Sequence, residues 1–544
     1  MAQAPMMDVQ LSIASLIAHA GRFHGATKIS SVDHTGALFE TNWAEVALNA
    51  RKVAQWLAGR DLNVGDRVAT LAWNSHRHLE IYFGAPGAGY ICHTANPRLH
   101  DDQLAFILNE AKDKVLFFDP DLIDKVLSVR ARLETVTTFV ALCPSNPELA
   151  SKLDGVLFYD DMLAKLSGAF DWPDLDERTP AMLCYTSGTT GNPKGVVYTH
   201  RSTVLHTLAC NQPDGMGVRA ADTLLMVVPM FHVCAWGTPF IAAAVGAELA
   251  LPGPKLDGES LIHLINETGA THALGVPTIW LGLLQALKRT GQTVESLERS
   301  IVGGAALPPS LMAAFRDDYG VELIHGWGMT EMSPVGAVNQ PLARHRDLAS
   351  DAMNAVREAQ GRPPFGLDMR IVDASGTALP HDGKAAGNLQ VKGPWVVDHY
   401  FLADETARTD DGWFDTGDIS SIDAQGFMRI RDRSKDIIKS GGEWISTVEL
   451  ENIAISHPAI ANAAAIAAEH PIWGERAVLI ATRSAKISEE DLLGAFGGKV
   501  ANWQIPDRVI FVDNLPIGST GKVLKAELRA TYGGALMHKN ASSS

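Results

Sequence analysis

The chain has 544 residues, of which 46% are hydrophobic, so it can bury a large core and is long enough for at least two domains. Its 62 acidic residues outnumber its 46 basic residues and give a formal net charge of -16. That charge disfavours binding to nucleic acid and to anionic membranes, so an anionic ligand needs a locally basic pocket.

The first 180 residues alternate helical and strand-like patterns. Apolar residues recur at helical spacing from Trp43 to Leu57, and Asn42 with Glu45 predicts a capping box at the start of that helix. An apolar run at 68–72 then predicts a strand. The same alternation predicts further buried strands at 223–228, 249–251, 273–276 and 300–302. We therefore expect an α/β fold whose large N-terminal domain has parallel-rich sheets with flanking helices.

The pattern changes after Gly361. Short segments separated by turn residues, at 368–372, 387–392 and 426–431, predict a β-subdomain. A basic stretch and a glycine pair follow, and then a helix that opens at Ser446 with Glu449 three residues later. We expect a domain of residues 1–431 that binds the nucleotide, followed by a small mobile α+β domain of residues 432–544.

The segment from Tyr185 to Gly195 has the composition of a phosphate-binding loop. Its glycines let backbone N–H groups approach an anion, its hydroxyls can donate further hydrogen bonds, and a lysine adds positive charge. Strand-like runs flank it at 181–185 and 196–198, which predicts a hairpin-like loop. The candidate nucleotide contacts in this loop are Thr186, Ser187, Gly188, Thr189, Thr190, Gly191 and Lys194.

Other nucleotide and catalytic motifs are excluded by spacing. A Walker A loop requires G-x-x-x-x-G-K-[ST], but the residue five after Gly188 is Pro193 and Lys194 is followed by Gly195. The sequence also contains no G-x-S-x-G, no H-E-x-x-H and no G-x-G-x-x-G after a strand. These absences remove the serine hydrolase, zinc protease and dinucleotide-binding classes.

The order of the remaining motifs resembles the acyl-adenylate-forming (AMP-binding) superfamily over nearly the whole chain. After the phosphate loop come Gly-Gly-Ala at 303–305, Gly-Trp-Gly-Met-Thr-Glu at 326–331, Trp-Phe-Asp-Thr-Gly-Asp at 413–418, Arg-Asp-Arg-Ser-Lys-Asp at 431–436 and Gly-Ser-Thr-Gly-Lys at 518–522. The resemblance is greatest to the fatty acyl-CoA synthetase branch, with medium-chain fatty acid and methylmercaptopropionate ligases nearest. It implies that a carboxylate attacks the α-phosphate of ATP and that a thiol then displaces AMP.

The resemblance also implies roles for particular residues. Glu331 is expected to bind Mg²⁺ with Thr186, and Asp418 and Arg433 are expected to contact the ribose. Lys522 resembles the catalytic lysine of adenylation. The wall around the adenine and the acyl phosphate is expected to include Gly304, Ala305, His325, Gly326, Trp327 and Thr330.

In this family the C-terminal domain rotates between the two half-reactions, and Asp432 lies where the hinge is expected. The rotation is expected to bring the stretch from Lys435 to Trp444 to the nucleotide, with Lys439 near phosphate. The pair Gly441 and Gly442 would then leave space for the pantetheine arm of coenzyme A.

The expected acyl channel is apolar. It is lined by His232, which is also a catalytic candidate, and by Val233, Trp236, Trp327, Pro334 and Val335. These residues suit an alkyl tail, and the resemblance favours a medium-chain fatty acid, while 3-methylmercaptopropionate and aryl acids stay as alternatives. No cation is available for a second carboxylate, so a dicarboxylic acid is disfavoured.

Expected ligands are therefore ATP, Mg²⁺, coenzyme A and a carboxylic acid, and a homodimer is plausible by the same resemblance. No apolar run is long enough to span a membrane, no signal peptide is visible, and the five scattered cysteines lack a C-x-x-C pair, which together suggest a soluble cytoplasmic protein with buried thiols. Two alternatives stay open: another acceptor, such as a carrier-protein thiol or the oxidation carried out by luciferases, and a nucleotide-binding protein that has lost its chemistry.

Overall fold

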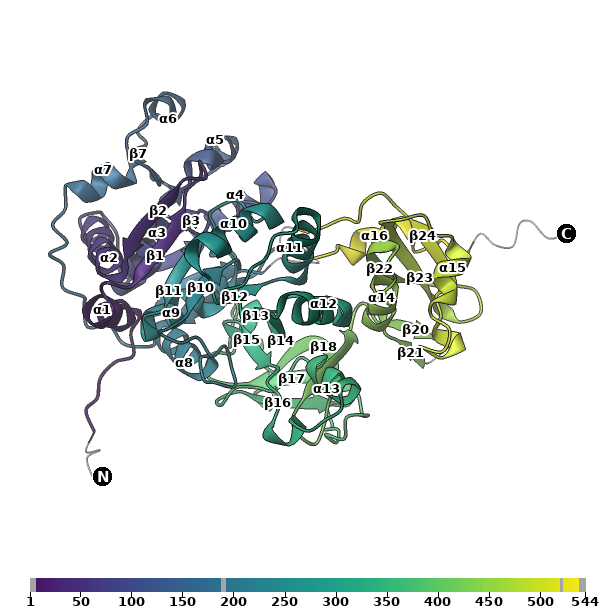
Figure 1. The fold of residues 1–544 in the computed structure, drawn as a ribbon. Helices are drawn as coiled ribbons and strands as arrows, with labels where there is room; N and C mark the ends of the chain where they lie inside the picture. The colour runs from purple at the N-terminus through teal and green to yellow at the C-terminus, as the bar shows by residue number, and fades with distance from the viewer. Residues whose placement is uncertain (1–5, 187–191, 442, 519–521, 538–544) are drawn as a thin grey trace.

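The computed structural model describes residues 6–186, 192–441, 443–518 and 522–537. Figure 1 shows a large N-terminal domain, coloured from purple to green, and a small yellow C-terminal domain beside it. The predicted fold class is confirmed: parallel-rich sheets with flanking helices form the large domain, which ends in a β-subdomain.

The first large sheet has eight strands within the described residues, in the order β15-β14-β13-β12-β10-β11-β1-β2. The inner strands run parallel, and only β2 and β15 pair antiparallel, at the two edges. The strands are β1 (Lys28–Val32), β2 (Leu38–Asn42), β10 (Thr223–Met226), β11 (Glu248–Leu251), β12 (His272–Gly275), β13 (Arg299–Val302), β14 (Glu322–Gly328) and β15 (Val335–Val338).

The second large sheet has seven strands within the same residues, in the order β7-β6-β5-β3-β4-β8-β9. All run parallel except β9, which forms an antiparallel hairpin with β8. The strands are β3 (Arg67–Leu71), β4 (Ile91–Thr94), β5 (Val115–Phe118), β6 (Thr138–Ala141), β7 (Leu157–Phe158), β8 (Pro180–Tyr185) and β9 (Gly195–Thr199).

Helices bury both faces of each large sheet, as parallel sheets require. One core cluster joins the two sheets through the helices between them: α1 (Ile13–Phe23), α2 (Trp43–Ala58), α3 (His76–Gly87), α8 (His200–Cys210) and α9 (Thr238–Val245). A second covers the seven-stranded sheet with α4 (Asp101–Glu110) and α5 (Ile123–Arg130). A third covers the eight-stranded sheet with α10 (Gly258–Thr268), α11 (Pro277–Thr290) and α12 (Pro309–Tyr319).

The remaining elements are smaller. The large domain also contains α6 (Pro147–Lys152), α7 (Tyr159–Ala164), α13 (Ser350–Arg357) and the 3₁₀ turns η1 (Pro120–Leu122), η2 (Val233–Gly237), η3 (Thr330–Met332) and η4 (Ala343–His345). Its β-subdomain is an antiparallel sheet of β16 (Asp368–Val372), β17 (Gly387–Lys392), β18 (Phe414–Ile422) and β19 (Met428–Arg433).

The C-terminal domain has its own sheet and core. The sheet contains β20 (Ile438–Ser440), β21 (Glu443–Ile445), β22 (Ile460–His470), β23 (Gly474–Arg483) and β24 (Arg508–Phe511). It packs against α14 (Thr447–Ile455), α15 (Glu489–Gly494) and α16 (Lys525–Tyr532), with η5 (Asn502–Gln504) before β24.

The local sequence signals agree with these elements. The Asn42 side chain accepts a hydrogen bond from the backbone N–H of Glu45 at the start of α2. The Ser446 side chain caps α14 in the same way through Glu449. Five cysteines occur, and each is buried and free. In the part of the chain that the structure describes, no helix is both long and apolar enough to cross a lipid bilayer.

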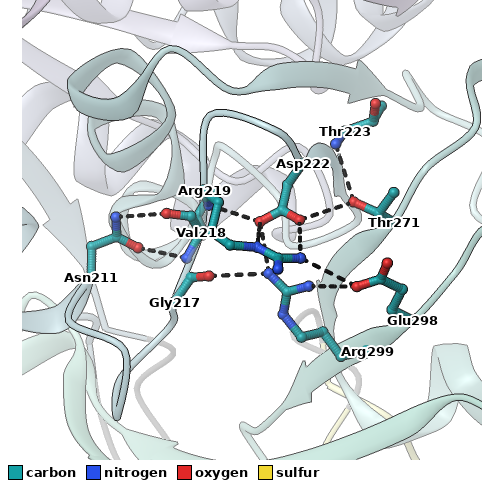
Figure 2. A network of polar contacts seen from close by, with 9 residues as sticks. All are labelled: Asn211, Gly217, Val218, Arg219, Asp222, Thr223, Thr271, Glu298 and Arg299. Atoms are coloured by element: carbon teal, nitrogen blue, oxygen red, sulfur yellow. Dashed lines mark hydrogen bonds and ion pairs between the residues drawn. The ribbon is translucent and has the colours of Figure 1, made fainter.

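A buried carboxylate ties the amino ends of the parallel strands together (Figure 2). Asp222, which is 1% exposed, precedes β10 and accepts hydrogen bonds from Arg219 and from Arg299 of β13. It also accepts one from the Thr271 hydroxyl beside β12, at 3.2 Å. Burial raises the pKa of Asp222, but the hydrogen bonds from the two arginines outweigh it and lower the pKa to about 2. The charged form is therefore the one that the fold stabilises.

We predict that Asp222→Asn lowers the free energy of unfolding by about 3 kcal/mol, because it leaves Arg299 without its buried partner. The folded-state pKa is depressed, so the stabilisation by Asp222 is present above about pH 4 and is lost as pH falls toward 2. Urea unfolding at pH 7 measures the effect. The control is Glu298→Gln, at a site 59% exposed, which should change stability by less than about 0.5 kcal/mol. Equal effects of the two variants would contradict the prediction.

Candidate functional site

Four of the predicted motifs meet at the carboxyl edge of the eight-stranded sheet. The segment 229–237 follows β10, Gly303–Ala305 follows β13, and the 326–331 segment ends β14 and enters η3. Ligands of open α/β sheets bind at this edge because successive loops converge there. The fourth motif, Asp418, reaches the same place from β18 of the β-subdomain.

The phosphate loop joins β8 and β9, the edge hairpin of the other large sheet, as its flanking strand patterns predict. Thr186 and Lys194 close its base: the Thr186 N–H donates to the Lys194 carbonyl, and the Lys194 N–H donates to Thr186 Oγ1 at 3.1 Å. The predicted contacts Ser187, Gly188, Thr189, Thr190 and Gly191 lie outside the described residues.

The predicted adenine wall is tightly packed. A side chain at Gly303 would meet the Gly326 carbonyl oxygen at 2.7 Å, so the loop after β13 can approach β14 only because Gly303 has no Cβ. His325 is buried and hydrogen-bonds to the Glu358 carbonyl, and burial lowers its pKa to about 4. His325 is therefore neutral at physiological pH. Gly304 and Ala305 follow on the more open side of this wall.

Asp418 is held between two of the other predicted residues. Its Oδ2 accepts a hydrogen bond of 3.0 Å from Trp327 Nε1, and its Oδ1 lies 2.8 Å from Arg433 Nε. The second contact is an ion pair whose angle does not make a hydrogen bond, so Oδ1 is a buried acceptor without a hydrogen-bond donor among the described residues. Burial raises the pKa of Asp418, and Arg433 opposes that shift. A buried acceptor that still needs a donor fits a sugar hydroxyl.

Glu331 is linked to the base of the phosphate loop through Tyr400, whose ring contacts Lys194. Its Oε1 accepts a hydrogen bond from the hydroxyl of Tyr400, and Thr330 beside it is buried, with its carbonyl accepting from Tyr198. Within the described residues, no group of three or more His, Cys, Asp or Glu side chains could hold a metal. Magnesium commonly binds through one or two carboxylates together with phosphate oxygens and water. The single carboxylate of Glu331 therefore fits a magnesium ion bound with the nucleotide. It does not fit a metal site made of protein side chains alone.

Lys522 is brought into this site from the C-terminal domain. It lies on an exposed loop, yet its ammonium group interacts with Arg433, Asp418, Glu331 and Lys435. Burial of the ammonium and then the neighbouring Arg433 lower the pKa of Lys522 to about 8, although Asp418 and Glu331 oppose that shift. The pKa of the half-buried His232, near 4, is lowered by burial and then by Lys522. The charge of Lys522 thus acts on His232, and the charges of Asp418 and Glu331 act on Lys522, which places the predicted catalytic residues near one another.

The predicted acyl wall contains a strained segment. Val233, Cys234, Ala235 and Trp236 all have φ between 48° and 57°, which forms a left-handed turn without glycine. Such residues cost about 1–2 kcal/mol each, so the surrounding structure must hold them. Asn74 does so in part, because its side chain donates to two carbonyls at the end of β10 and accepts from Met230 N at 2.7 Å.

The turn places the Trp236 indole beside the glycines of the adenine wall. A Cβ at Gly303 would lie 3.2 Å from that ring. Opposite, Pro334 and Val335 are buried, and Val335 N donates to Nε2 of His206, whose pKa burial lowers to about 3. The sequence analysis did not find His206, because a histidine at helical spacing on α8 has no motif around it.

The expected hinge residue, Asp432, contacts both domains. The Asp432 backbone pairs with Ile419 of β18, while its side chain accepts hydrogen bonds from the backbone and hydroxyl of Thr447 in α14. Lys525 of α16 donates to the same hydroxyl and pairs with Glu451 at 2.7 Å. Burial raises the pKa of Asp432 to about 6, and Lys525 opposes that shift.

Two of the predicted nucleotide contacts, Lys439 and Trp444, are not brought together with the others. Lys439 and Trp444 are cross-strand partners on the β20–β21 hairpin, where the Lys439 N–H donates to Glu475 and Trp444 is 45% exposed. Gly441 packs under Trp473 of the same domain, and Gly442 lies outside the described residues. Lys435 lies nearer, among the charges around Lys522.

Comparison with known proteins agrees with the fold. Residues 18–401 match the AMP-binding enzyme family, and residues 449–522 match the AMP-binding enzyme C-terminal domain. The chain belongs to the AMP-binding enzyme family.

Similar proteins match along their whole length. The chain is 52% identical over 533 residues to 3-methylmercaptopropionyl-CoA ligase of Ruegeria lacuscaerulensis, covering 98% of this chain and 99% of the relative. It is 50% identical over 539 residues to medium-chain-fatty-acid–CoA ligase of Ectopseudomonas oleovorans, covering 99% of each. The crystal structure of ATP-bound MatB from Rhodopseudomonas palustris superposes with a TM-score of 0.81 at 28% identity, covering 96% of this chain and 99% of that one.

The lowered pKa of Lys522 predicts an alkaline limit for adenylation. Above about pH 8 the free enzyme loses the ammonium charge, so kcat/KM for ATP in pyrophosphate exchange should fall there. In Lys522→Arg the guanidinium stays charged, so any activity that remains should persist above about pH 9. If both proteins lose activity over the same pH range, another group sets the limit.

Proposed function

We propose that the protein is an AMP-forming acid:CoA ligase whose preferred acid is a medium-chain fatty acid. The AMP-forming ligase class follows from the family and from full-length relatives that are ligases. The single observation that supports the site assignment is the electrostatic proximity of Lys522, before α16, to Glu331 of η3 and Asp418 of β18.

In the first step, a carboxylate oxygen of the acid attacks the α-phosphorus of ATP. The bond from that phosphorus to the bridging oxygen breaks, and pyrophosphate leaves with its electron pair. Lys522 stabilises the charge between the carboxylate and the α-phosphate, while Asp418 and Arg433 orient the ribose. Glu331 and Thr186 would hold Mg²⁺, which would supply positive charge next to the triphosphate.

In the second step, the thiolate of coenzyme A attacks the acyl carbonyl carbon and AMP leaves. We propose that domains 1–431 and 432–544 move relative to each other about Asp432 between the steps. Because Lys439 and Trp444 lie on an exposed hairpin while Lys522 is in the pocket, the described arrangement is the one that suits adenylation.

For the acid, the support is an apolar wall. Val233, Pro334 and Val335 are buried and uncharged, and Trp236 closes against Gly303. An alkyl tail needs no buried partner charge, so it suits this wall. A second candidate acid is 3-methylmercaptopropionate, favoured by the 52% identity to a ligase with that name.

Three further features complete the proposal. Coenzyme A is the acceptor in preference to a carrier-protein thiol, since the full-length relatives are CoA ligases. A cytoplasmic location fits five free, buried cysteines. A homodimer is expected by resemblance.

We predict that ATP–pyrophosphate exchange depends on a monocarboxylic acid, and that acyl-CoA forms when coenzyme A is added. A panel of four- to twelve-carbon alkanoates, 3-methylmercaptopropionate and benzoate, compared by kcat/KM, ranks the acids. Octanoate should exceed benzoate by at least about tenfold, because its longer alkyl tail can bury more apolar surface against the wall. If kcat/KM is highest with 3-methylmercaptopropionate, that acid is the preferred substrate in place of a medium-chain fatty acid. If no acid supports ATP–pyrophosphate exchange, the ligase proposal is wrong.

We predict that Lys522→Ala loses adenylation by about 10³-fold while it keeps most of its thioester formation from a supplied acyl-adenylate. Lys522 acts on charge at the α-phosphate, which the second step no longer builds up. Pyrophosphate exchange and thioester formation from synthetic octanoyl-AMP are measured separately. The control is Lys486→Ala, which changes an exposed lysine in the connection between β23 and α15. Equal losses in both half-reactions would refute the role.

A further inference from the structure

Tyr400 connects two parts of the nucleotide site that come from different sheets. Its hydroxyl donates a hydrogen bond of 3.0 Å to Glu331 Oε1. The ammonium of Lys194, at the end of the phosphate loop, lies 4.7 Å from the centre of its ring. Tyr400 belongs to the connection between β17 and β18 and to none of the motifs from which the site was predicted.

The backbone around Tyr400 is fixed to the same two parts. Val397 N donates to the Glu331 carbonyl at 2.7 Å, and Phe401 N donates to the Gly195 carbonyl at 2.8 Å. A Cβ at Gly195 would lie 2.8 Å from Phe401 Cβ, so the connection packs closely against the end of the loop. The half-buried ring of Tyr400 therefore has little freedom to move away from Glu331 and Lys194.

The chemistry of the contact suits a cation site. Burial and the nearby Glu331 carboxylate raise the pKa of Tyr400, so its hydroxyl keeps the proton that it donates. That bond occupies Oε1, which leaves Oε2 of Glu331 as the oxygen available to a cation. A charge-assisted hydrogen bond to one carboxylate oxygen restricts where the other can point.

The ring also separates two opposite charges. Among the ion pairs of the described residues, none joins Lys194 to Glu331. The ammonium lies over the face of the ring and the carboxylate is bonded to its hydroxyl, so each charge is retained for a ligand. A direct pair between them would neutralise both before any phosphate or cation arrived.

We propose that Tyr400 is a positioning residue that presents Glu331 to a divalent cation and keeps Lys194 apart for the phosphates of the nucleotide. This inference rests on the proposed function, in which Glu331 binds the cation of the ATP complex.

The test measures binding without turnover. Mn²⁺ is titrated by electron paramagnetic resonance into enzyme with a non-hydrolysable ATP analogue, in the absence of acid and coenzyme A. Tyr400→Phe keeps the ring but loses the hydrogen bond, so its Mn²⁺ dissociation constant should rise about tenfold. Its affinity for the analogue in EDTA should stay within about twofold of wild type, because Lys194 still has its ring.

Tyr400→Leu loses both contacts, so it should weaken metal-free binding of the analogue as well, by about fivefold or more. Tyr319→Phe, on α12 away from the site, is the matched control and should change neither constant. Tyr400→Phe with an unchanged Mn²⁺ dissociation constant overturns the inference, as does wild-type enzyme that binds no Mn²⁺ with the analogue. Because no acid is present, a failed acid panel leaves this result intact and the two failures are distinguishable.

Discussion

One buried carboxylate, that of Asp418, joins the parts of the molecule on which the site depends. It belongs to the β-subdomain, it accepts from Trp327 on the eight-stranded sheet, and it pairs with Arg433 at the end of the last strand before the small domain. A carboxylate that is 1% exposed is costly to bury unless it is paired, so this position tightly constrains its neighbours. The three regions meet at this site because Trp327 and Arg433 both contact the Asp418 carboxylate.

The pocket also reconciles an acidic protein with an anionic substrate. The chain carries a net charge of -16, yet Arg433, Lys435 and Lys522 gather around Asp418 and Glu331. Burial, and then repulsion by Arg433 and Lys435, lower the pKa of Lys522 although the two carboxylates oppose that shift. These three cations would attract a triphosphate locally, so local charge is more informative here than the total.

The fold class and most strands could be predicted from the sequence, because the spacing of apolar residues and the capping residues act locally. Asn42 and Ser446, for example, both cap the helices that they were expected to begin. Motif spacing also pointed to Glu331, Asp418 and Lys522, which lie near one another in the structure. Tyr400 and His206 escaped, since their importance comes from contacts across 69 and 129 residues of sequence, and no local pattern encodes those. The left-handed turn at Val233 was also unpredictable, because residue preferences disfavour it and only tertiary contacts hold it.

The interlaced hinge has a mechanical consequence. Asp432 gives its side chain to α14 of the small domain, whereas the next residue, Arg433, gives its side chain to Asp418 of the large one. Two consecutive residues of the chain therefore contact different domains. The small domain cannot rotate relative to the large domain while both contacts keep their present geometry. A rotation about Asp432, as proposed between the two half-reactions, would therefore have to break or rebuild at least one of these two contacts.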